Sequence, residues 1–403
     1  MRTARRVSGF GTTVFSEFSA LAANTGAVNL GQGFPDFDGP EEVKEAAVRA
    51  IRGGVNQYAA GAGNPALRAA IAEHAARFYG QAVDPAREVT VTSGATEAIF
   101  DAVAGLVDPG DEVVAFEPLY DSYAASVAMA HGVLKPVLLR PPDAGHAAWW
   151  FEPDALRAAF SERTKVLLLN TPHNPTGKVF TRHELELCAA LCQEHDVVAV
   201  ADEVYEHLVY APARHLRLAT LPGMAERTLT LSSAGKTFSL TGWKVGWAIG
   251  PEELRGAVQS AHQFVTFATA APLQAAVAAA LRLPDAFFAG LPLQFAARRD
   301  RLAGALAAAG LPAFPAEGSY FLIAGIAGAR DGAGAPFADD FAFCRWLTRE
   351  VGVAAIPPSA FYLPEHAAHG RGFARFAFCK REATLEEAAR RLLRLRGAGG
   401  EPV

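Results

Sequence analysis

The sequence predicts an α/β fold in which a large domain with a doubly wound, mostly parallel sheet is joined to a smaller α+β domain. From about residue 40 to residue 280, short β-rich runs alternate with helical stretches rich in Ala, Leu and charged residues. Several β-rich runs are continuously apolar, as expected for strands that helices cover on both faces. The chain of 403 residues is also longer than a single ordinary core requires.

Seven strands are predicted in the large domain, with helical patterns such as 95–106 and 182–194 between most of them. In a sheet of this kind, ligands bind beyond the carboxyl ends of the strands, so the residues that follow each strand are the candidates for a site. The strands are expected at residues 89–92, 112–116, 133–138, 166–170, 197–201, 228–231 and 245–249.

Both ends of the chain differ from this alternating pattern. A long helical stretch at 293–309, short strands at 320–323 and 375–378, and a last helix at 385–395 follow the large domain, with a surface loop expected at 325–336. We therefore expect residues 1–40 to form an arm and part of the small domain. Residues 41–285 form the large domain and residues 286–403 the rest of the small one.

The composition argues against several classes of protein. A net charge of −5 gives no electrostatic reason to expect nucleic acid or an anionic membrane as a partner. Charged, Gly or Pro residues interrupt every apolar stretch well short of the roughly 20 residues that span a bilayer. The four cysteines lack zinc-site spacing, so free thiols are expected and no metal. We expect a cytoplasmic protein.

The first polar motif follows the first strand of the large domain. Ser93, Gly94, Ala95, Thr96 and Glu97 open a predicted helix, whose free backbone N–H groups can receive a phosphate. Ser and Gly at a helix start are also common caps, so this motif alone is a weak indication.

Two further motifs follow later strands. The loop 170–177 contains two prolines, and a rigid turn explains them, but it does not explain why Asn174 lies at the ligand-binding edge. Asp202 and Glu203 end an apolar strand, where a carboxylate without a cationic partner is costly. A protonated ring nitrogen facing Asp202 would remove that cost, and Tyr205 is close enough in the chain to reach the same ligand.

The last motif surrounds Lys236, which lies in a loop of small residues after a strand. Burial lowers the pKa of a lysine. An uncharged lysine amine can form a Schiff base with a carbonyl. Ser233 and Lys244 flank it with a hydroxyl and a second cation, both suited to a phosphate. This combination indicates a cofactor site rather than a surface lysine.

These motifs resemble those of class I aminotransferases of fold type I, which use pyridoxal 5′-phosphate. The branch of kynurenine, glutamine and methionine aminotransferases is the most similar, together with bacterial N-succinyldiaminopimelate aminotransferases. The resemblance covers about residues 15–395. It rests on the segments 29–36, 56–58, 174–177, 202–205, 233–238 and 375–378.

The resemblance implies a role for each position that matches a cofactor-binding motif. Lys236 corresponds to the catalytic lysine that holds the cofactor as a Schiff base and moves the substrate proton. Asp202 corresponds to the acid that keeps the ring nitrogen protonated. Asn174 and Tyr205 correspond to partners of the ring's phenolic oxygen, and Tyr120 to the aromatic residue stacked on the ring. The implied phosphate ligands are the backbones of Ala95 and Thr96 and the side chains of Ser233, Lys244 and Tyr58.

Tyr58 would reach the phosphate of a partner subunit, so the resemblance implies a homodimer with shared active sites. On the substrate side, Arg375 corresponds to the arginine that binds the α-carboxylate, assisted by Asn174 and the backbone at Gly33. Phe15, Tyr58 and Phe267 are the candidates for an apolar side-chain pocket. Ordinary core packing is the other interpretation of Phe15 and Phe267.

The function implied is a ping-pong transamination between an L-amino acid and a 2-oxo acid. The expected donors are kynurenine, glutamine, methionine or aromatic amino acids. The related branch has a His where this chain has Ala268, which counts against a strict preference for kynurenine. Two alternatives stay open. One is an N-succinyl-LL-2,6-diaminopimelate aminotransferase, and the other is a cysteine-S-conjugate β-lyase that releases pyruvate and ammonia.

Overall fold

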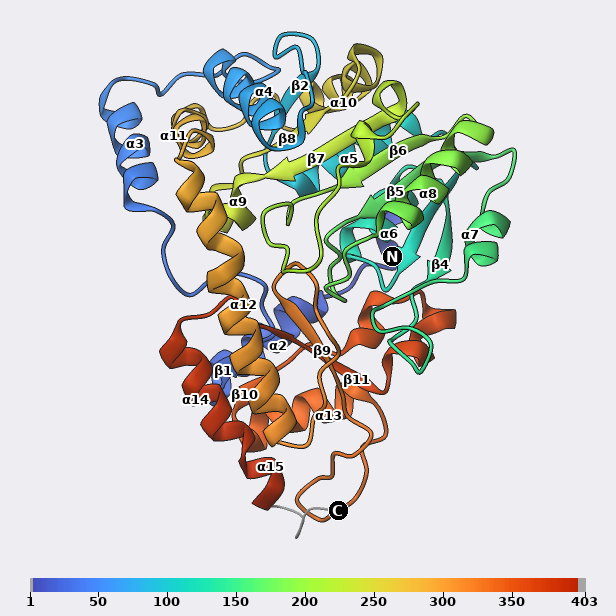
Figure 1. Cartoon of the computed structure of the whole chain (residues 1–403), viewed down its shortest axis with the longest axis vertical. Helices are drawn as coiled ribbons and strands as arrows, with labels where there is room; N and C mark the ends of the chain where they lie inside the picture. The colour runs from blue at the N-terminus through green and yellow to red at the C-terminus, as the bar shows by residue number, and fades with distance from the viewer. Residues whose placement is uncertain (1–2, 398–403) are drawn as a thin grey trace.

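A seven-stranded sheet in the order β2-β8-β7-β6-β5-β3-β4 forms the frame of the upper part of the molecule (Figure 1). β8 runs antiparallel to its neighbours β2 and β7, and all other neighbours are parallel. The computed structural model describes residues 3–397. The strands are β2 (Val89–Thr92), β3 (Glu112–Glu117), β4 (Val133–Leu138), β5 (Thr164–Asn170), β6 (Val198–Asp202), β7 (Thr228–Ser233) and β8 (Gly246–Ile249).

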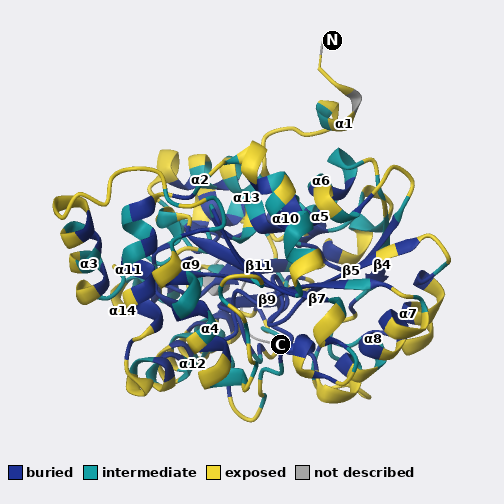
Figure 2. Cartoon of the chain, turned by 90° about the horizontal axis from the view of Figure 1, so that it is seen from above, coloured by how far each residue is buried: buried dark blue, intermediate teal, exposed yellow. Residues whose placement is uncertain are grey.

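Helices cover both faces of this sheet because alternate strand residues point to opposite sides. Val166 and Leu168 of β5 pack with α5 (Ala95–Leu106), α6 (Asp121–Met129) and α10 (Glu252–Val265). The intervening residues Leu167 and Leu169 pack with α7 (Pro153–Ala159) and α8 (Arg182–Glu194) on the other face. Figure 2 shows the strands buried between helices whose outer faces are exposed. α3 (Glu41–Arg52), α4 (Pro65–Tyr79) and α11 (Ala271–Leu281) pack around β2 and β8.

The lower part of the molecule, which we call the small-sheet region, combines both chain ends (Figure 1). β1 (Val28–Asn29) pairs in parallel with β10 (Val353–Ala354), and β9 (Phe321–Gly325) pairs antiparallel with β11 (Phe373–Ala377). α12 (Asp285–Ala308) runs from α11 down into this region. Its other helices are α2 (Val14–Thr25), α13 (Asp340–Trp346), the π-helical turn η4 (Leu347–Val351), α14 (Glu382–Leu392) and α15 (Arg394–Gly397).

The remaining elements are short. α1 (Arg5–Ser8) lies near the N-terminus, and α9 (Ala234–Thr237) follows β7. The 3-10 turns are η1 (Leu218–Thr220), η2 (Ala225–Arg227), η3 (Thr241–Trp243), η5 (Pro358–Phe361) and η6 (Pro364–Gly370). Within the described residues no single helix is long and apolar enough to span a membrane. α11 and α12 pass that test only as a pair, which is bent by 89°. All four cysteines are buried and free.

The predicted fold class is confirmed, and the seven predicted strands all form. The largest error concerns α12, which begins at Asp285 and not at residue 293. The helix continues through Pro292. Proline lacks a backbone N–H and usually interrupts a helix. Packing of Phe288, Leu291 and Phe295 into the neighbouring cores outweighs that local cost. The last helix likewise begins and ends earlier than predicted, at Glu382 and Leu392. The domain boundaries at 40 and 285 stay predictions.

Candidate active site

A cavity lies beyond the carboxyl ends of β5, β6 and β7, where the small-sheet region covers this edge of the large sheet. Asn170, Asp202 and Ser233 end those three strands, and Phe321 and Arg375 of β9 and β11 face them across the cavity. All predicted site residues line it except two, Tyr58 and Phe267. Those that line it are Phe15, Gly33, Ala95, Thr96, Tyr120, Asn174, Asp202, Tyr205, Ser233, Lys236, Lys244 and Arg375.

One end of the cavity is suited to an anion. α5 begins there after Gly94, whose φ of 86° suits glycine, and no side chain caps this helix start. A Cβ added to Gly94 would lie 3.0 Å from Lys244 Nζ, so the ammonium group is directly beside the helix start. A Cβ on Gly246 would come within 2.6 Å of the Gly94 carbonyl carbon, so only glycine lets β8 approach this closely. Free N–H groups and a cation converge on one point.

Lys236 lies in the middle of the cavity on the short helix α9. Its Nζ donates a hydrogen bond to Tyr320 Oη at 3.0 Å, and the Tyr320 hydroxyl donates in turn to the carbonyl oxygen of Gly33. Burial lowers the pKa of Lys236 to about 8. About a tenth of this amine is therefore uncharged at a pH of about 7, far more than for an ordinary lysine. Tyr320 was not among the residues predicted for the site, because it reaches the amine from the small-sheet region.

Asp202 forms the floor of the cavity at the end of β6. Its Oδ2 accepts a hydrogen bond from the hydroxyl of Tyr123 at 2.6 Å. Burial raises the pKa of Asp202 to about 6, and this hydrogen bond opposes the rise. Tyr123 was missed in the sequence, although it lies three residues after Tyr120, which precedes the first residue of the same helix.

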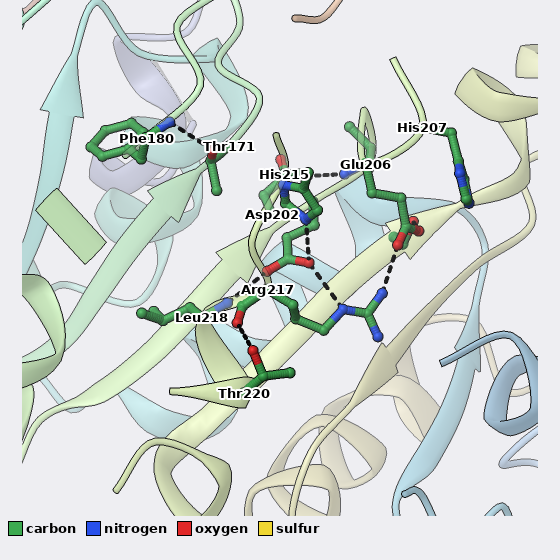
Figure 3. A network of polar contacts seen from close by, with 12 residues as sticks. Thr171, Phe180, Asp202, Glu206, His207, His215, Arg217, Leu218 and Thr220 are labelled. Atoms are coloured by element: carbon green, nitrogen blue, oxygen red, sulfur yellow. Dashed lines mark hydrogen bonds and ion pairs between the residues drawn. The ribbon is translucent and has the colours of Figure 1, made fainter. Parts of the chain in front are cut away.

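Glu203, the second carboxylate of this motif, does not line the cavity and instead contacts His215 and Arg217, which Figure 3 labels. Arg217 donates from Nε to Glu203 Oε2 at 3.1 Å and from Nη2 to Glu206 Oε2 at 2.6 Å. His215 Nε2 lies 3.0 Å from the same Glu203 oxygen. The buried charges of Glu203 and Glu206 are thus compensated within the protein. Asp202 is the carboxylate of the motif that faces the cavity.

Among residues 3–397, two clusters of His and carboxylate residues lie outside the cavity. In the first, Nε2 of His74 and Nε2 of His207 are 2.7 Å apart, and burial lowers the pKa values to about 4 and about 3. This describes a hydrogen bond between two neutral rings. In the second, His262 Nδ1 lies 2.9 Å from Glu97 Oε1, and burial raises the pKa of Asp101 beside them to about 7. A protein contact accounts for the first cluster, whereas in the second both carboxylate oxygens of Asp101 and Nε2 of His262 are buried without a hydrogen-bond partner. We assign neither cluster to a metal.

Arg375 lies at the end of the cavity opposite Lys244. Its Nη1 donates to Asn174 Oδ1 at 3.1 Å and its Nη2 to the Gly31 carbonyl oxygen at 2.7 Å. Nε is buried without a hydrogen-bond partner, and among the described residues no carboxylate lies within ion-pair distance. Burial lowers the pKa of Arg375 to about 10, so it remains a cation at neutral pH.

Aromatic rings surround this guanidinium group. The ring centroids of Phe321, Phe361 and Phe15 lie 4.2, 4.9 and 5.1 Å from Arg375 Cζ. Phe15 therefore contacts the cavity in addition to the core, and Phe361 is a neighbour that the sequence did not indicate. A buried cation that lacks an anion, in an apolar surround, is suited to binding a carboxylate.

Tyr58 and Phe267 lie together outside the cavity. Their side chains are 83% and 54% exposed, and their rings meet edge to face at a centroid distance of 5.1 Å. Phe267 has a φ of 70°, which is unusual for a non-glycine residue. The role expected for Tyr58 requires a partner subunit, and Phe267 lines neither this cavity nor the core of the described chain. Both roles stay predictions.

Comparisons with known proteins agree with this geometry. The family model for aminotransferase class I and II matches residues 25–392. A probable N-succinyldiaminopimelate aminotransferase DapC of Mycobacterium tuberculosis is 50% identical over 97% of this chain and 98% of its own. Kynurenine–oxoglutarate transaminase 3 of Mus musculus is 42% identical over 96% and 89%.

Solved structures give the same result. The N-succinyldiaminopimelate aminotransferase of Mycobacterium tuberculosis superposes with a TM-score of 0.92 at 49% identity, over 98% of this chain and 100% of the other. YbdL of Escherichia coli, identified as having a methionine aminotransferase function, gives 0.89 at 39% identity with the same coverage. The chain therefore belongs to the class I and II aminotransferases, enzymes that depend on pyridoxal 5′-phosphate.

Proposed function

We propose that this aminotransferase moves the amino group of an L-amino acid with a sizeable, uncharged side chain to a 2-oxo acid, by a ping-pong mechanism. Kynurenine, glutamine, methionine and aromatic amino acids are the proposed donors. One observation carries the proposal. Arg375 is buried, has no carboxylate partner among the described residues, and is surrounded by Phe321, Phe361 and Phe15. A substrate α-carboxylate would neutralise it, and the rings would favour an apolar side chain beside that carboxylate.

The opposite end of the cavity fits the cofactor. The uncapped start of α5, with Ser233 and Lys244, offers N–H groups, a hydroxyl and a cation to a phosphate. Asp202 suits a protonated pyridine nitrogen, because that cation would offset the cost of the buried carboxylate. Tyr120, Asn174 and Tyr205 line the space between these two ends. When bound, pyridoxal 5′-phosphate supplies an electron sink for the charge left on the substrate Cα.

In this proposal Arg375 binds and orients the substrate. Its Nε and terminal nitrogens can form charge-assisted hydrogen bonds to a carboxylate, each contributing about 1.5–3 kcal/mol. Asn174 holds the guanidinium through Nη1 and so fixes its plane. A fixed carboxylate fixes the direction of the Cα–H bond relative to Lys236. Positioning of this kind lowers the entropic part of the barrier.

Lys236 is the proposed proton carrier. With a pKa of about 8 its amine exists in both protonation states near neutral pH, so it can take a proton from the substrate Cα and release it again. General acid–base catalysis of this kind contributes about 10²–10⁴-fold to the rate. Tyr320 holds the amine by a hydrogen bond of 3.0 Å and limits the positions it can reach. Lys236 is also the amine proposed to link covalently to the cofactor.

We also propose a homodimer with shared sites. Exposed aromatic side chains support it, because Tyr58, Phe264 and Phe267 leave large apolar surfaces in water. Light scattering in solution would test the assembly, with twice the chain mass of 42.5 kDa expected. A cytoplasmic location stays a prediction, which fractionation of the host cells would test.

Transamination of N-succinyl-LL-2,6-diaminopimelate is the second candidate, supported by the 50% identity to the Mycobacterium tuberculosis relative. This substrate carries a distal carboxylate that favours a further cation. The cations lining the cavity of the described chain are Lys236, Lys244 and Arg375, each with another proposed role. The second candidate therefore needs a cation from a partner subunit.

A screen of amino donors against several 2-oxo acids tests the proposal, with pyruvate release monitored without an added oxo acid. Highest kcat/KM for methionine, glutamine, kynurenine or an aromatic donor supports it. Highest kcat/KM for N-succinyl-LL-2,6-diaminopimelate supports the second candidate instead. Pyruvate and ammonia formed from a cysteine S-conjugate, without consumption of an oxo acid, would indicate β-lyase activity.

A further inference from the structure

Glu117 connects the large sheet to the small-sheet region. It is the last residue of β3, lies three residues before Tyr120 and is fully buried. Its Oε1 accepts a hydrogen bond from the backbone N–H of Leu363 at 2.6 Å, and its Oε2 contacts His366 Nδ1 at 2.6 Å. Both donors belong to the segment 358–370 that precedes β11. We call this set of contacts the Glu117 tie.

The same segment forms part of the wall around Arg375. Phe361 lies in it, 4.9 Å from the guanidinium carbon and 5.8 Å from the ring of Phe15. The Phe361 carbonyl oxygen accepts a hydrogen bond from the N–H of Leu119, at 2.6 Å, two residues beyond Glu117. The Glu117 tie and this backbone bond thus hold the stretch 361–366 against the residues that lead to Tyr120.

Further contacts fix the start of the segment, whereas the hydrogen bonds from Leu363 and His366 in its later part go to Glu117. Asp340 accepts hydrogen bonds from the backbone and hydroxyl of Ser359, at 2.7 and 2.9 Å, and Ile356 pairs with Arg375 by two backbone bonds. These contacts precede Phe361. Beyond it, Leu363 and His366 both bond to Glu117.

A buried carboxylate is stable only if its hydrogen bonds are satisfied. Burial raises the pKa of Glu117, and the bonds from Leu363 and His366 oppose that rise. His366 is 39% exposed, so removing its ring leaves little cavity but leaves one carboxylate oxygen of Glu117 without its partner. The expected response is a shift of the segment, because Glu117 itself is fixed in the sheet.

We propose that Glu117 and His366 are positioning residues, which place Phe361 and Phe15 around Arg375 and so set the affinity of the site for its carboxylate substrates. The inference rests on the proposed role of Arg375. It adds a role for β3. This strand leads to Tyr120 on the cofactor side of the cavity, and through Glu117 it would also hold the residues on the substrate side in place. Neither residue lines the cavity, so both would act through Phe361.

The test compares three variants of the full-length holoenzyme. His366→Ala removes the side-chain donor, His366→Asn restores an N–H donor near the position of Nδ1, and His369→Ala removes an exposed histidine three residues further on. For His366→Ala we expect KM to rise about fivefold for amino acid and oxo acid alike, as for loss of one hydrogen bond. kcat should change by a factor of about two or less. Cofactor affinity should not change.

Hydrogen–deuterium exchange supplies a readout that does not depend on catalysis. Peptides covering 358–370 should exchange faster in His366→Ala than in the parent, and His366→Asn should return both exchange and KM toward the parent values. An unchanged KM in His366→Ala, or an equal rise in His369→Ala, would overturn the proposal. If the parent protein transaminates none of the donors, the proposed substrates are wrong. The exchange comparison would then still decide whether the tie holds the segment.

Discussion

The hydroxyl of Tyr123 donates a hydrogen bond of 2.6 Å to the carboxylate of Asp202, at the floor of the cavity. A donor to the charged form stabilises that form, so this bond keeps Asp202 more acidic than its burial alone would allow. The proposed chemistry needs Asp202 ionised. We therefore expect Tyr123 to influence the lower pH limit of activity, although it does not line the cavity.

Tyr123→Phe should shift that limit upward. A hydrogen bond to a charged group contributes about 1.5–3 kcal/mol, which corresponds to about 1–2 pH units. The pKa of Asp202 should rise, and the acid limb of the activity profile should move to higher pH. The measurement is the pH profile of kcat/KM. Tyr210→Phe, which removes a buried hydroxyl bonded to the Ser319 carbonyl oxygen, is the control. Equal shifts in both variants would contradict the role of Tyr123.

Lys236→Ala should abolish transamination and the borohydride-fixed attachment of the cofactor to the chain. The amine is the proposed link and the proposed proton carrier, so both losses are expected together. Lys244→Ala is the matched control, since it removes a cavity lysine at the phosphate end. That variant should bind cofactor more weakly but still show attachment at Lys236 by peptide mass spectrometry. If the cofactor still became covalently attached to the Lys236→Ala chain, Lys236 would not be the residue that links it.

Arg375→Ala should raise KM for amino donors and oxo acids alike. Loss of two charge-assisted hydrogen bonds corresponds to about 10²-fold or more. The affinity for pyridoxal 5′-phosphate, measured by titration of the apoenzyme, should change little, because Arg375 lies at the end of the cavity opposite Lys244. Weaker cofactor binding with an unaltered KM would place the carboxylate site elsewhere.

Asp101→Asn should stabilise the protein at mildly alkaline pH. Burial raises the folded-state pKa of Asp101 to about 7, so the folded protein favours its protonated form. The unfolded chain loses this proton near its ordinary pKa of 3.8, so the folded state becomes less stable as pH rises from there to about 7. The side chain of Asn does not ionise, so the Asp101→Asn variant does not lose stability in this way as pH rises.

The unfolding temperature of Asp101→Asn should therefore exceed that of the parent by more at a pH of about 8 than at about 4. Asp108→Asn, at an exposed position, serves as the control. A stability difference that does not vary with pH would mean that Asp101 is ionised in the folded protein across this range.

Residues that follow a strand end could be placed at the cavity from the sequence. Asp202, Ser233 and Asn174 each follow or close a buried strand, and a parallel sheet brings such ends to one edge. The sequence did not indicate Tyr320 and Phe361, because both come from the small-sheet region and their proximity depends on how the two parts of the molecule pack. Glu117 had no predicted role and lay just beyond the strand predicted at 112–116, since nothing local distinguishes a buried carboxylate whose donors lie more than two hundred residues away.

At Pro292 a local sequence signal pointed to the wrong structure. Its presence argues locally for a helix boundary, yet α12 passes through it. The packing that decides this is non-local, because Phe288 joins one core and Phe295 another. Local preference is overruled when a continuous helix places both side chains in apolar surroundings.

The reversed direction of β8 determines how the two lysines of the cavity reach it. Because β8 runs against β7, Gly246 at its start pairs with Ser233 at the end of β7, and the connection between them stays at the ligand edge. If β8 ran parallel to β7, the chain would have to return to the amino ends of the strands before β8 could begin. Lys236 and Lys244 are both in this connection, so an insertion of one residue there would misplace the reacting amine and the phosphate-side cation in a single change.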